Sequence, residues 1–317
     1  MKADLDLVLL SWNRSAMTIE AIQNVKSQIG VTTMVWIIDQ GSHEKDYQHL
    51  DNYVRDDPLI NLIRLEKNVG VAAGRNLGMS LGDAEYIACI DNDAEFAQPN
   101  ALRMVVDKFD LTPNLAVIGF LINKFNDRSL DTNSWAYPRL LIEKRFNEFK
   151  TTRFCGAGHA IRRSALGSTL GYDEKLFFYW EELDLAYQLI NNGHEIIFFP
   201  QIEVLHKISD EMRTFWKNDR YYYLVRNALY LEWKYYRHFS RFVIRAIGYL
   251  IKGVINGVLL QSLRALFDTR RLISQIPKHY DSSLTLEAKK YIYRYDEIYR
   301  GSFFRRLRSE VLAKLPK

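Results

Sequence analysis

Residues 86–93 read YIACIDND, an apolar run that ends in Asp91, Asn92 and Asp93. The run indicates a buried β-strand, and because side chains alternate along a strand, Asp91 and Asp93 leave it on the same side. Two carboxylates in this position suit a divalent cation that bridges a diphosphate, since Mg²⁺ and Mn²⁺ prefer oxygen ligands. A solvated turn is the alternative interpretation of such a triplet taken alone.

The chain around this stretch alternates short apolar runs with helical patterns, which is typical of successive βα units in a mostly parallel sheet. We expect strands at residues 5–10, 34–39, 60–65, 86–91 and 115–121, and helices at residues 16–28, 43–54, 71–81 and 101–109. This order predicts an α/β fold with a doubly wound sheet, whose ligands lie beyond the carboxyl ends of the strands.

Polar residues follow four of these strands, so four strand ends are expected to converge on one crevice. The sequence SWNR follows the first strand, Asp39 ends the second, NVG follows the third, and the DND triplet ends the fourth. The carboxylate of Asp39 suits the imide N–H of a uracil or thymine ring, and a simple turn residue is the alternative.

The stretch 68–78, NVGVAAGRNLG, surrounds Arg75 and Asn76 with glycine and alanine. Small residues let the backbone approach a ligand while the guanidinium and the amide point at it. A helix made of small residues for close packing on the sheet is the alternative interpretation.

Further along the chain, residues 153–163 (RFCGAGHAIRR) predict a strand, a bend and a second strand. A helix is expected at residues 181–192, followed by two short strands at 195–199 and 202–205 that lead to His206. A histidine in this position is either a metal ligand or a structural residue.

The segment YWEELD, residues 179–184, puts Glu181, Glu182 and Asp184 in the first turn of the predicted helix. The helix dipole favours acidic residues there, which is the structural interpretation. The functional interpretation is that one of these carboxylates acts as general base on an acceptor hydroxyl.

The charge is divided unevenly, because residues 1–206 hold 20 basic and 28 acidic residues whereas residues 207–317 hold 23 and 10. Arg237, Arg241, Arg245 and Lys252 share one side of a helix whose opposite side carries Phe242, Val243, Ala246, Ile247, Leu250 and Val254. Tyrosines and tryptophans at residues 221–236 are residue types that suit a membrane interface. We expect this region to lie on an anionic membrane, with packing against protein as the alternative, and no motif indicates nucleic-acid binding.

The location of the protein is predicted to be cytoplasmic. The N-terminal apolar run is interrupted by Asp4 and Asp6 and does not resemble a signal peptide. The two cysteines, Cys89 and Cys155, lie in apolar stretches, which fits reduced thiols. The uncharged residues 253–263 are too few to span a bilayer. We therefore expect a protein that is peripheral on the cytoplasmic face of the membrane.

Taken together, these segments resemble family 2 of the inverting glycosyltransferases, the group with the GT-A fold that includes bacterial transferases of cell-surface polysaccharides. The resemblance covers residues 4 to about 210 and is closest to the rhamnosyltransferase-like branch, on the stretches NVGVAAGRNLG and FFYWEELDLAYQL. It implies a catalytic GT-A domain at residues 1–210 and a helical, basic region at residues 211–317.

The resemblance also implies roles for individual residues. A nucleotide-sugar site would be formed by Ser11, Asn13, Asp39, Gly70, Arg75, Asn76, Asp91 and Asn92. Asp93 and His206 would coordinate a divalent metal, Mn²⁺ or Mg²⁺. The family base is usually the Asp of a Glu-Asp pair, where this chain has Glu181-Glu182, so Glu182 takes the matching position. Glu181 is the second candidate for the base and Asp184 the third.

The predicted function is transfer of a hexose or deoxyhexose, with inversion, from a UDP- or dTDP-sugar to a glycan or lipid-linked acceptor in cell-surface polysaccharide synthesis. Two alternatives stay open. A sugar-nucleotide nucleotidyltransferase also uses acidic residues and magnesium, although SWNRSA after the first strand is not its usual glycine-rich loop. The second alternative is a glycan- or membrane-binding scaffold that has lost turnover, because Glu181-Glu182 replaces the usual Glu-Asp pair.

Overall fold

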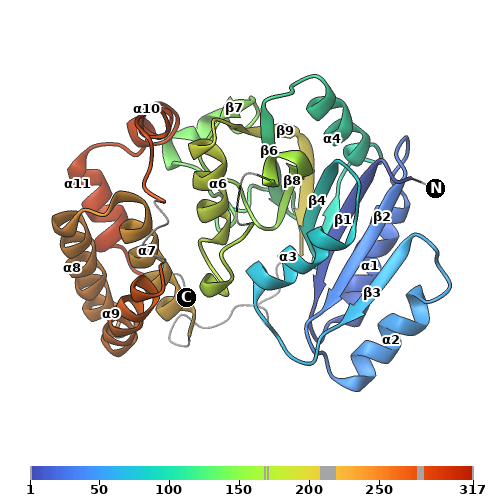
Figure 1. Ribbon diagram of the computed structural model, residues 1–317, viewed down its shortest axis with the longest axis horizontal. Helices are drawn as coiled ribbons and strands as arrows, with labels where there is room; N and C mark the ends of the chain where they lie inside the picture. The colour runs from blue at the N-terminus through green and yellow to red at the C-terminus, as the bar shows by residue number, and fades with distance from the viewer. Residues whose placement is uncertain (1, 168, 170, 208–218, 277–281, 316–317) are drawn as a thin grey trace.

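The computed structural model describes residues 2–167, 169, 171–207, 219–276 and 282–315, and its centre is one twisted sheet (Figure 1). The strands are β1 (Leu5–Ser11), β2 (Thr33–Asp39), β3 (Ile60–Arg64), β4 (Tyr86–Asp91), β5 (Ala94–Phe96), β6 (Leu115–Lys124), β7 (Phe149–Lys150), β8 (Gly158–Arg162) and β9 (Glu195–His206). The five strands predicted within the first 121 residues are confirmed to within a few residues at their ends.

The strands follow the order β3-β2-β1-β4-β8-β6-β9-β5, with β7 paired to β9 outside this path. Strands β1 to β4 are parallel to one another, and β6 is parallel to β9. The register pairs Leu10 with Asp91 and Ser11 with Asp39, so the carboxyl ends of β1, β2 and β4 lie at the same edge of the sheet.

The sheet is mixed where a mostly parallel one was predicted. Strand β8 runs antiparallel between β4 and β6, and the short strand β5, which the sequence pattern did not indicate, runs antiparallel to β9. The two predicted strands before His206 form the single strand β9, because its pairing with β6 continues past Pro200 through a register shift. Of the predicted strand pair at 153–163 only β8 forms.

Helices cover both faces of the sheet. Leu5, Leu7 and Leu9 pack with the helices α1 (Ser15–Lys26), α2 (Glu44–Val54) and α4 (Ala101–Asp110) on one face. On the opposite face, Val8, Ile87 and Cys89 pack with the helices α3 (Val71–Leu81), α5 (Arg163–Leu166) and α6 (Glu181–Asn191). The alternation of strand side chains thus produces two apolar layers, as expected for an α/β fold.

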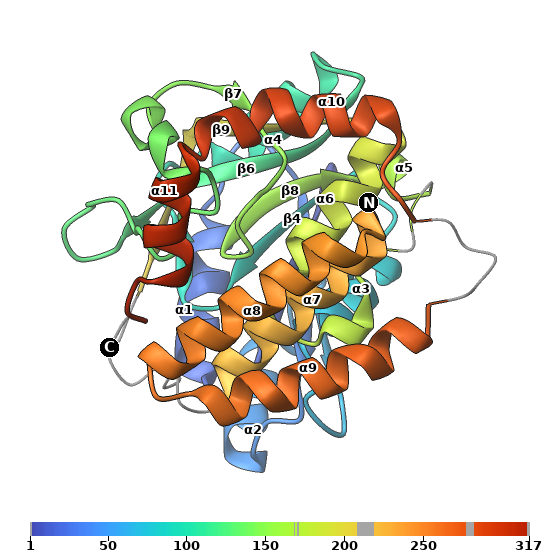
Figure 2. The same cartoon turned by 90° about the vertical axis from the view of Figure 1, so that its left-hand side faces the viewer.

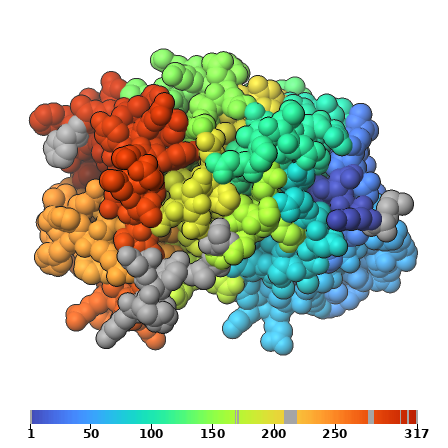
Figure 3. Space-filling view, turned by 45° about the horizontal axis from the view of Figure 1, so that its top comes forward, coloured from blue at the N-terminus to red at the C-terminus, as the bar shows by residue number. Residues whose placement is uncertain are grey.

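The described residues after β9 form a helical region at the end of the molecule opposite α2 (Figure 1), and Figure 2 looks onto that end. Its helices are α7 (Tyr221–Tyr236), α8 (Phe239–Ile255), α9 (Leu259–Ser274), α10 (Leu286–Tyr295) and α11 (Phe303–Arg306). Tyr230 and Leu231 of α7 and Ile292 of α10 share the apolar core of α6. The space-filling view shows these helices in close contact with the rest of the molecule (Figure 3). The predicted boundary at residue 210 lies outside the described residues.

The amphipathic helix predicted after residue 237 forms as α8, and two arginines of its cationic side pair with a carboxylate of α7 while staying partly exposed. Arg237 precedes α8 in a left-handed backbone conformation. Arg241 and Arg245 pair with the buried carboxylate of Glu232 on α7, and Lys252 donates to the carbonyl of Glu310. A buried carboxylate requires a partner, and these two partly exposed arginines supply it. That the cationic side faces a membrane stays a prediction.

The aromatic side chains of α7 that were expected at a membrane interface are buried or partly buried in the protein. Tyr221, Tyr222 and Tyr235 are buried, and Tyr223, Trp233 and Tyr236 are partly buried. Among the described residues, none of the helices is both long enough and apolar enough to cross a bilayer.

Candidate functional site

Asp91, Asp93 and His206 form a cluster at the carboxyl edge of the sheet. Antiparallel pairing of β5 with β9 places Ala94 opposite His206, which brings the residue before Ala94 beside the histidine. His206 Nε2 lies 3.3 Å from Asp93 Oδ1, and one ligand atom from each of the three residues lies within 4.8 Å of the others. Two carboxylate oxygens and an imidazole nitrogen at this spacing fit Mn²⁺ or Mg²⁺, which commonly complete their coordination with phosphate oxygens.

Asp131, which the sequence interpretation missed, holds the other nitrogen of His206. Its carboxylate is 1% exposed and lies 3.0 Å from His206 Nδ1, and it also accepts a hydrogen bond from Ser134. Burial opposes a charge on His206, but the hydrogen bonds to Asp131 and Asp93 raise its pKa to about 10. An acidic partner on Nδ1 orients the ring with Nε2 towards Asp93, and a metal bound at Nε2 would replace the proton there. The segment around Asp131 has no periodicity that would have marked it.

Arg75 connects this cluster to the helix α6. The guanidinium is buried and donates from Nη1 to Glu182 Oε1 at 2.9 Å and from Nη2 to the carbonyl of Gly156 at 2.8 Å. Nη2 also lies 3.3 Å from Asp91 Oδ1. Since Glu182 and Asp91 contact the same guanidinium, the acidic start of α6 adjoins the Asp-Asp-His cluster.

The three carboxylates of the YWEELD segment lie in different surroundings. Glu182 is partly exposed and paired with Arg75. Glu181 is almost fully buried, and burial followed by the negative charge of Glu182 raises its pKa well above 4.5. Asp184 is completely buried and pairs at 2.6 Å with Lys234 of α7, so the structure does not bring it to the cluster.

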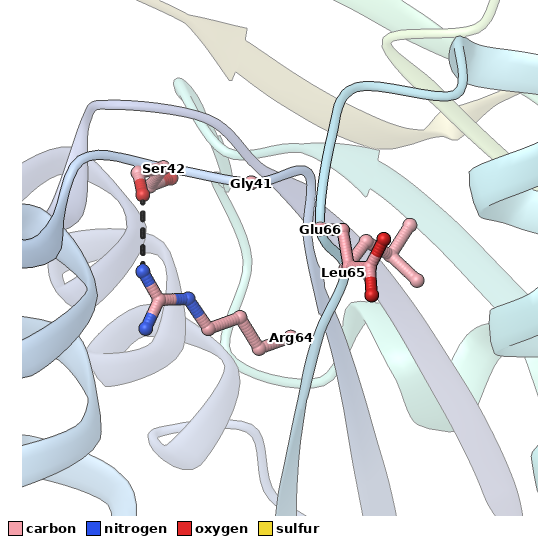
Figure 4. Close-up of a pocket in the computed structure, with 5 residues that line it drawn as sticks. All are labelled: Gly41, Ser42, Arg64, Leu65 and Glu66. Carbon is pink, nitrogen blue, oxygen red and sulfur yellow. Dashed lines mark hydrogen bonds between the residues drawn. The ribbon is translucent and has the colours of Figure 1, made fainter.

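Asp39 lies at the same sheet edge beside a pocket. One of its carboxylate oxygens accepts from the backbone N–H of Ser42, and the other is buried without a hydrogen-bond partner among the described residues. A cavity of about 400 Å³ next to it is lined by Gly41, Ser42, Arg64, Leu65 and Glu66 (Figure 4). A buried acceptor without a donor indicates a polar ligand group at this place.

The remaining predicted residues from the first and fourth strand ends support the loops around this pocket. The Ser11 hydroxyl is hydrogen-bonded to Thr18, and the Asn92 amide donates to the same Thr18 hydroxyl. Asn13 has a left-handed backbone, accepts from His43 N–H, and donates its own N–H to Ser42. The bonds of Asn13 hold the loop after β1 against the loop after β2, and those of Ser11 and Asn92 connect β1 and β4 to α1.

Gly70 and Asn76 both contact the segment that leads to α6. Gly70 has φ of 89°, and a Cβ there would lie 2.5 Å from the carbonyl oxygen of Phe177, so only glycine fits. The Asn76 amide donates to Tyr172 and Glu174 and accepts from Tyr172. Asn76 therefore anchors that segment, and the structure does not bring it to the Asp-Asp-His cluster.

Comparison with proteins of known sequence supports a single family. A model described as glycosyl transferase family 2 matches residues 6–170, which is just over half of the chain. The succinoglycan biosynthesis protein ExoO of Rhizobium meliloti is 27% identical over 179 residues, which cover 48% of this chain and 51% of that protein. The minor teichoic acid biosynthesis protein GgaA of Bacillus subtilis is 28% identical over 178 residues, which cover 55% and 39%. The chain thus spans about half or less of these relatives' length.

Among solved structures, the mannosyltransferase PcManGT from Pyrobaculum calidifontis, in complex with GDP-Man and Mn²⁺, superposes with a TM-score of 0.61 at 15% identity. The match covers 98% of this chain and 86% of that one, and at this identity it shows the shared GT-A fold. The family match and the strand-end geometry agree, and the chain therefore belongs to glycosyl transferase family 2.

Proposed function

We propose that this chain transfers a hexose or deoxyhexose from a UDP- or dTDP-sugar to a glycan or lipid-linked acceptor, with inversion at the anomeric carbon, in the synthesis of a cell-surface polysaccharide. The observation that carries this proposal is the grouping of Asp91, Asp93 and His206 beside Glu182, with Arg75 between them. The deoxyhexose option includes the rhamnosyltransferase-like branch. Residues 1–210 would form the catalytic unit, with the helical region 211–317 packed against it.

The nucleobase would bind in the pocket beside Asp39. The unpaired carboxylate oxygen of Asp39 is the acceptor that the imide N–H of uracil or thymine requires. The loops that carry Ser11 and Asn13 border this region, and Gly70 lets the backbone after β3 approach closely. A base placed there would direct its diphosphate towards the ends of β4 and β9.

Asp93 and His206, with Asp91, would hold Mn²⁺ or Mg²⁺ next to the diphosphate. Their donor atoms already lie within one coordination sphere, and Asp131 fixes the orientation of the imidazole. The metal, when bound, would stabilise the negative charge that develops on the leaving nucleoside diphosphate. Asn92 joins this loop to Thr18 and so keeps the two carboxylates in place.

Glu182 is the proposed general base. It is partly exposed and held by Arg75, whereas Glu181 is buried and favours its neutral form. In the proposed reaction Glu182 accepts the proton of the acceptor hydroxyl while that oxygen bonds to the anomeric carbon and the diphosphate leaves from the opposite side. This single displacement inverts the configuration and needs no covalent intermediate. Arg75 would keep Glu182 aligned with the cluster.

The partners follow from the same proposal. A lipid-linked acceptor would be presented at a membrane, and we place the protein on the cytoplasmic face, where nucleotide sugars are donors. Nucleic acid is not among the proposed partners, because the basic region carries no recognition motif. Membership of a glycosyltransferase family favours sugar transfer over the nucleotidyltransferase alternative, and the Glu-Glu pair is the feature that leaves a non-catalytic scaffold to be tested.

The proposal is tested with UDP-, dTDP-, GDP- and CDP-sugars, each with and without Mn²⁺. We expect a UDP- or dTDP-sugar to raise the melting temperature only with the metal, and Asp93→Ala to abolish this shift. Asp83→Ala, which removes an exposed carboxylate before β4, is the matched control and should keep it. NMR of the product would show an anomeric configuration opposite to that of the donor. No stabilisation by any sugar nucleotide with metal would favour the scaffold, and retention of configuration would refute the mechanism.

A further inference from the structure

The helices α8 and α9 carry a row of large apolar side chains that no described element covers. We call this surface the apolar ridge; it comprises Ile244, Ile247, Ile251, Val254, Ile255, Leu259, Leu260, Leu263 and Phe267. These side chains are between 38% and 78% exposed. Single exposed apolar residues are ordinary, but a contiguous group of this size indicates an interaction surface.

The spacing of these residues puts them on the outer side of a helical hairpin. Ile244, Ile247 and Ile251 recur at intervals of three and four, which places them on one side of α8. The inner side uses small residues, and the contact is so close that a Cβ on Gly253 would lie 2.3 Å from the Ser262 hydroxyl of α9. Figure 2 shows both helices on the same outer face of the molecule.

The two rows meet at the tip of the hairpin. Val254 and Ile255 end α8, and Leu259 and Leu260 begin α9 after a turn of three residues. Leu260, the most exposed member of the ridge, therefore stands beside the exposed end of α8. The result is one continuous apolar strip rather than two separate ones.

Positive charge borders the strip. Residues 239–274 contain six basic residues and a single acidic one, Asp268. Asp268 accepts a hydrogen bond from Tyr222, and Arg264 lies 4.0 Å from it. Arg270 and Arg271, one turn after Phe267, are exposed. An apolar strip with a basic rim is complementary to lipid chains beneath anionic headgroups.

The hairpin is connected to the catalytic helix through α7. Asn227 of α7 donates to the carbonyls of Leu176, Phe178 and Tyr179, in the segment that leads directly into Glu181 and Glu182. Thr269 of α9 in turn donates to a backbone carbonyl of α7. A partner surface that binds α9 would therefore hold the catalytic site, which includes Glu182, at a defined distance and orientation from that surface.

We propose that the apolar ridge inserts into the surface of an anionic lipid bilayer, with Arg264, Arg270 and Arg271 at the headgroups. This inference rests on the proposed location at a membrane and names the surface that makes the contact. A second copy of the chain is a poorer occupant, since two ridges would bring the exposed Arg270 and Arg271 of both copies together. The cationic side predicted from the sequence is not this surface, because its arginines pair with Glu232.

The test is flotation of the full chain with vesicles of phosphatidylcholine, alone or mixed with phosphatidylglycerol. We expect binding to the mixed vesicles that weakens at high salt. For the double variant Leu260→Glu/Phe267→Glu, the partition coefficient between water and the mixed vesicles should fall about 10-fold or more, because two apolar side chains no longer insert. Leu111→Glu, which changes an 82% exposed leucine beyond α4, is the matched control and should bind like the wild type.

Two further measurements make the outcome decisive. Arg270→Gln/Arg271→Gln should lose the preference for anionic vesicles, and circular dichroism should show all variants folded, since the changed side chains are exposed. Wild-type binding that the ridge substitutions leave unchanged would overturn the proposal. The proposal would also be overturned if the wild type were a dimer, the ridge substitutions converted it to a monomer, and vesicle binding persisted in those variants. Transfer to a soluble acceptor, measured on the same variants, should be unchanged and reports separately on the proposed activity.

Discussion

Lys234 is the residue whose replacement should reveal most about how the helical region supports the site. Its ammonium group is buried between α6 and α7, 2.6 Å from Asp184 and 3.0 Å from Asp173. Tyr235 also donates to Asp184, at 2.8 Å. Lys234→Met keeps the aliphatic length of the side chain but leaves both carboxylates without their cation.

The expected loss of stability is large because Asp184 is fully buried. Removing one partner of a buried ion pair typically costs about 3–5 kcal/mol, since the remaining charge is left uncompensated. Most domains are stable by about 5–15 kcal/mol, so this change would remove a substantial fraction. Replacing the pair together, as Lys234→Met/Asp184→Leu, should recover most of the loss, because apolar groups of similar size need no partner.

The contributions of Lys234 and Asp173 depend on pH in opposite directions, while burial raises the pKa of Asp184 above 3.8 despite its pairing with Lys234. Burial opposes the charge on Lys234, but Asp184 and Asp173 raise its pKa above 10.5. Burial likewise opposes the charge on Asp173, but Lys234 lowers its pKa below 3.8. The contribution of Lys234 is therefore fully present below pH 10.5 and is lost as the pH rises through its folded-state pKa. The contribution of Asp173 is present above pH 3.8 and is lost on acidification.

The measurement is the free energy of unfolding from urea titrations followed by circular dichroism. Lys290→Met is the control, because Lys290 forms an exposed pair with Glu287 that should contribute under about 0.5 kcal/mol. A loss below about 1 kcal/mol in Lys234→Met would refute the assignment of Lys234 as a structural link between α6 and α7.

Three further predictions address the site itself. Asp131→Asn should weaken Mn²⁺ binding, measured by calorimetry, about 10-fold because the His206 ring loses its ionised partner; unchanged affinity would show that Asp131 does not orient the histidine. Glu182→Gln should reduce the turnover number by about 100-fold or more with little change in the affinity for the donor, since the proton acceptor is lost. Full turnover in that variant would overturn its role as the base. Gly70→Ala should destabilise the fold by about 1–3 kcal/mol in thermal unfolding, because a positive φ and contact with the Phe177 carbonyl strain the backbone; an unchanged melting temperature would contradict this.

The elements of the first half of the chain were predictable because their signals are local. The apolar run before Asp91 and the helical pattern after Gly70 depend on residues that are neighbours in the sequence. Parallel strands place their carboxyl ends at one edge, so the convergence of the loops that carry Asp39 and Asp93 followed from topology. The family resemblance rested on the same segments.

Other features depended on pairing between distant segments. The direction of β8 and the existence of β5 were set by hydrogen bonds to strands far away in the chain. Asp131, 75 residues before His206, lies in a segment without periodicity, and only folding shows that its carboxylate reaches the imidazole. Arg75 was expected to line the nucleotide pocket, and its bonds to Glu182 and Gly156 became visible only in three dimensions.

The sequence by itself determined that polar loops meet at the carboxyl edge of the sheet, which residue types lie in those loops, and the family. It could do so because periodicity and residue type are properties of short segments. The tertiary structure decided which of the two successive glutamates is buried, which carboxylate the arginines of α8 pair with, and that the apolar side of α8 stays exposed. These outcomes depend on whether a charged group finds a partner when elements pack. A single buried carboxylate, Glu232, pairs with two arginines of the side predicted to be cationic, which the helical pattern alone could not indicate.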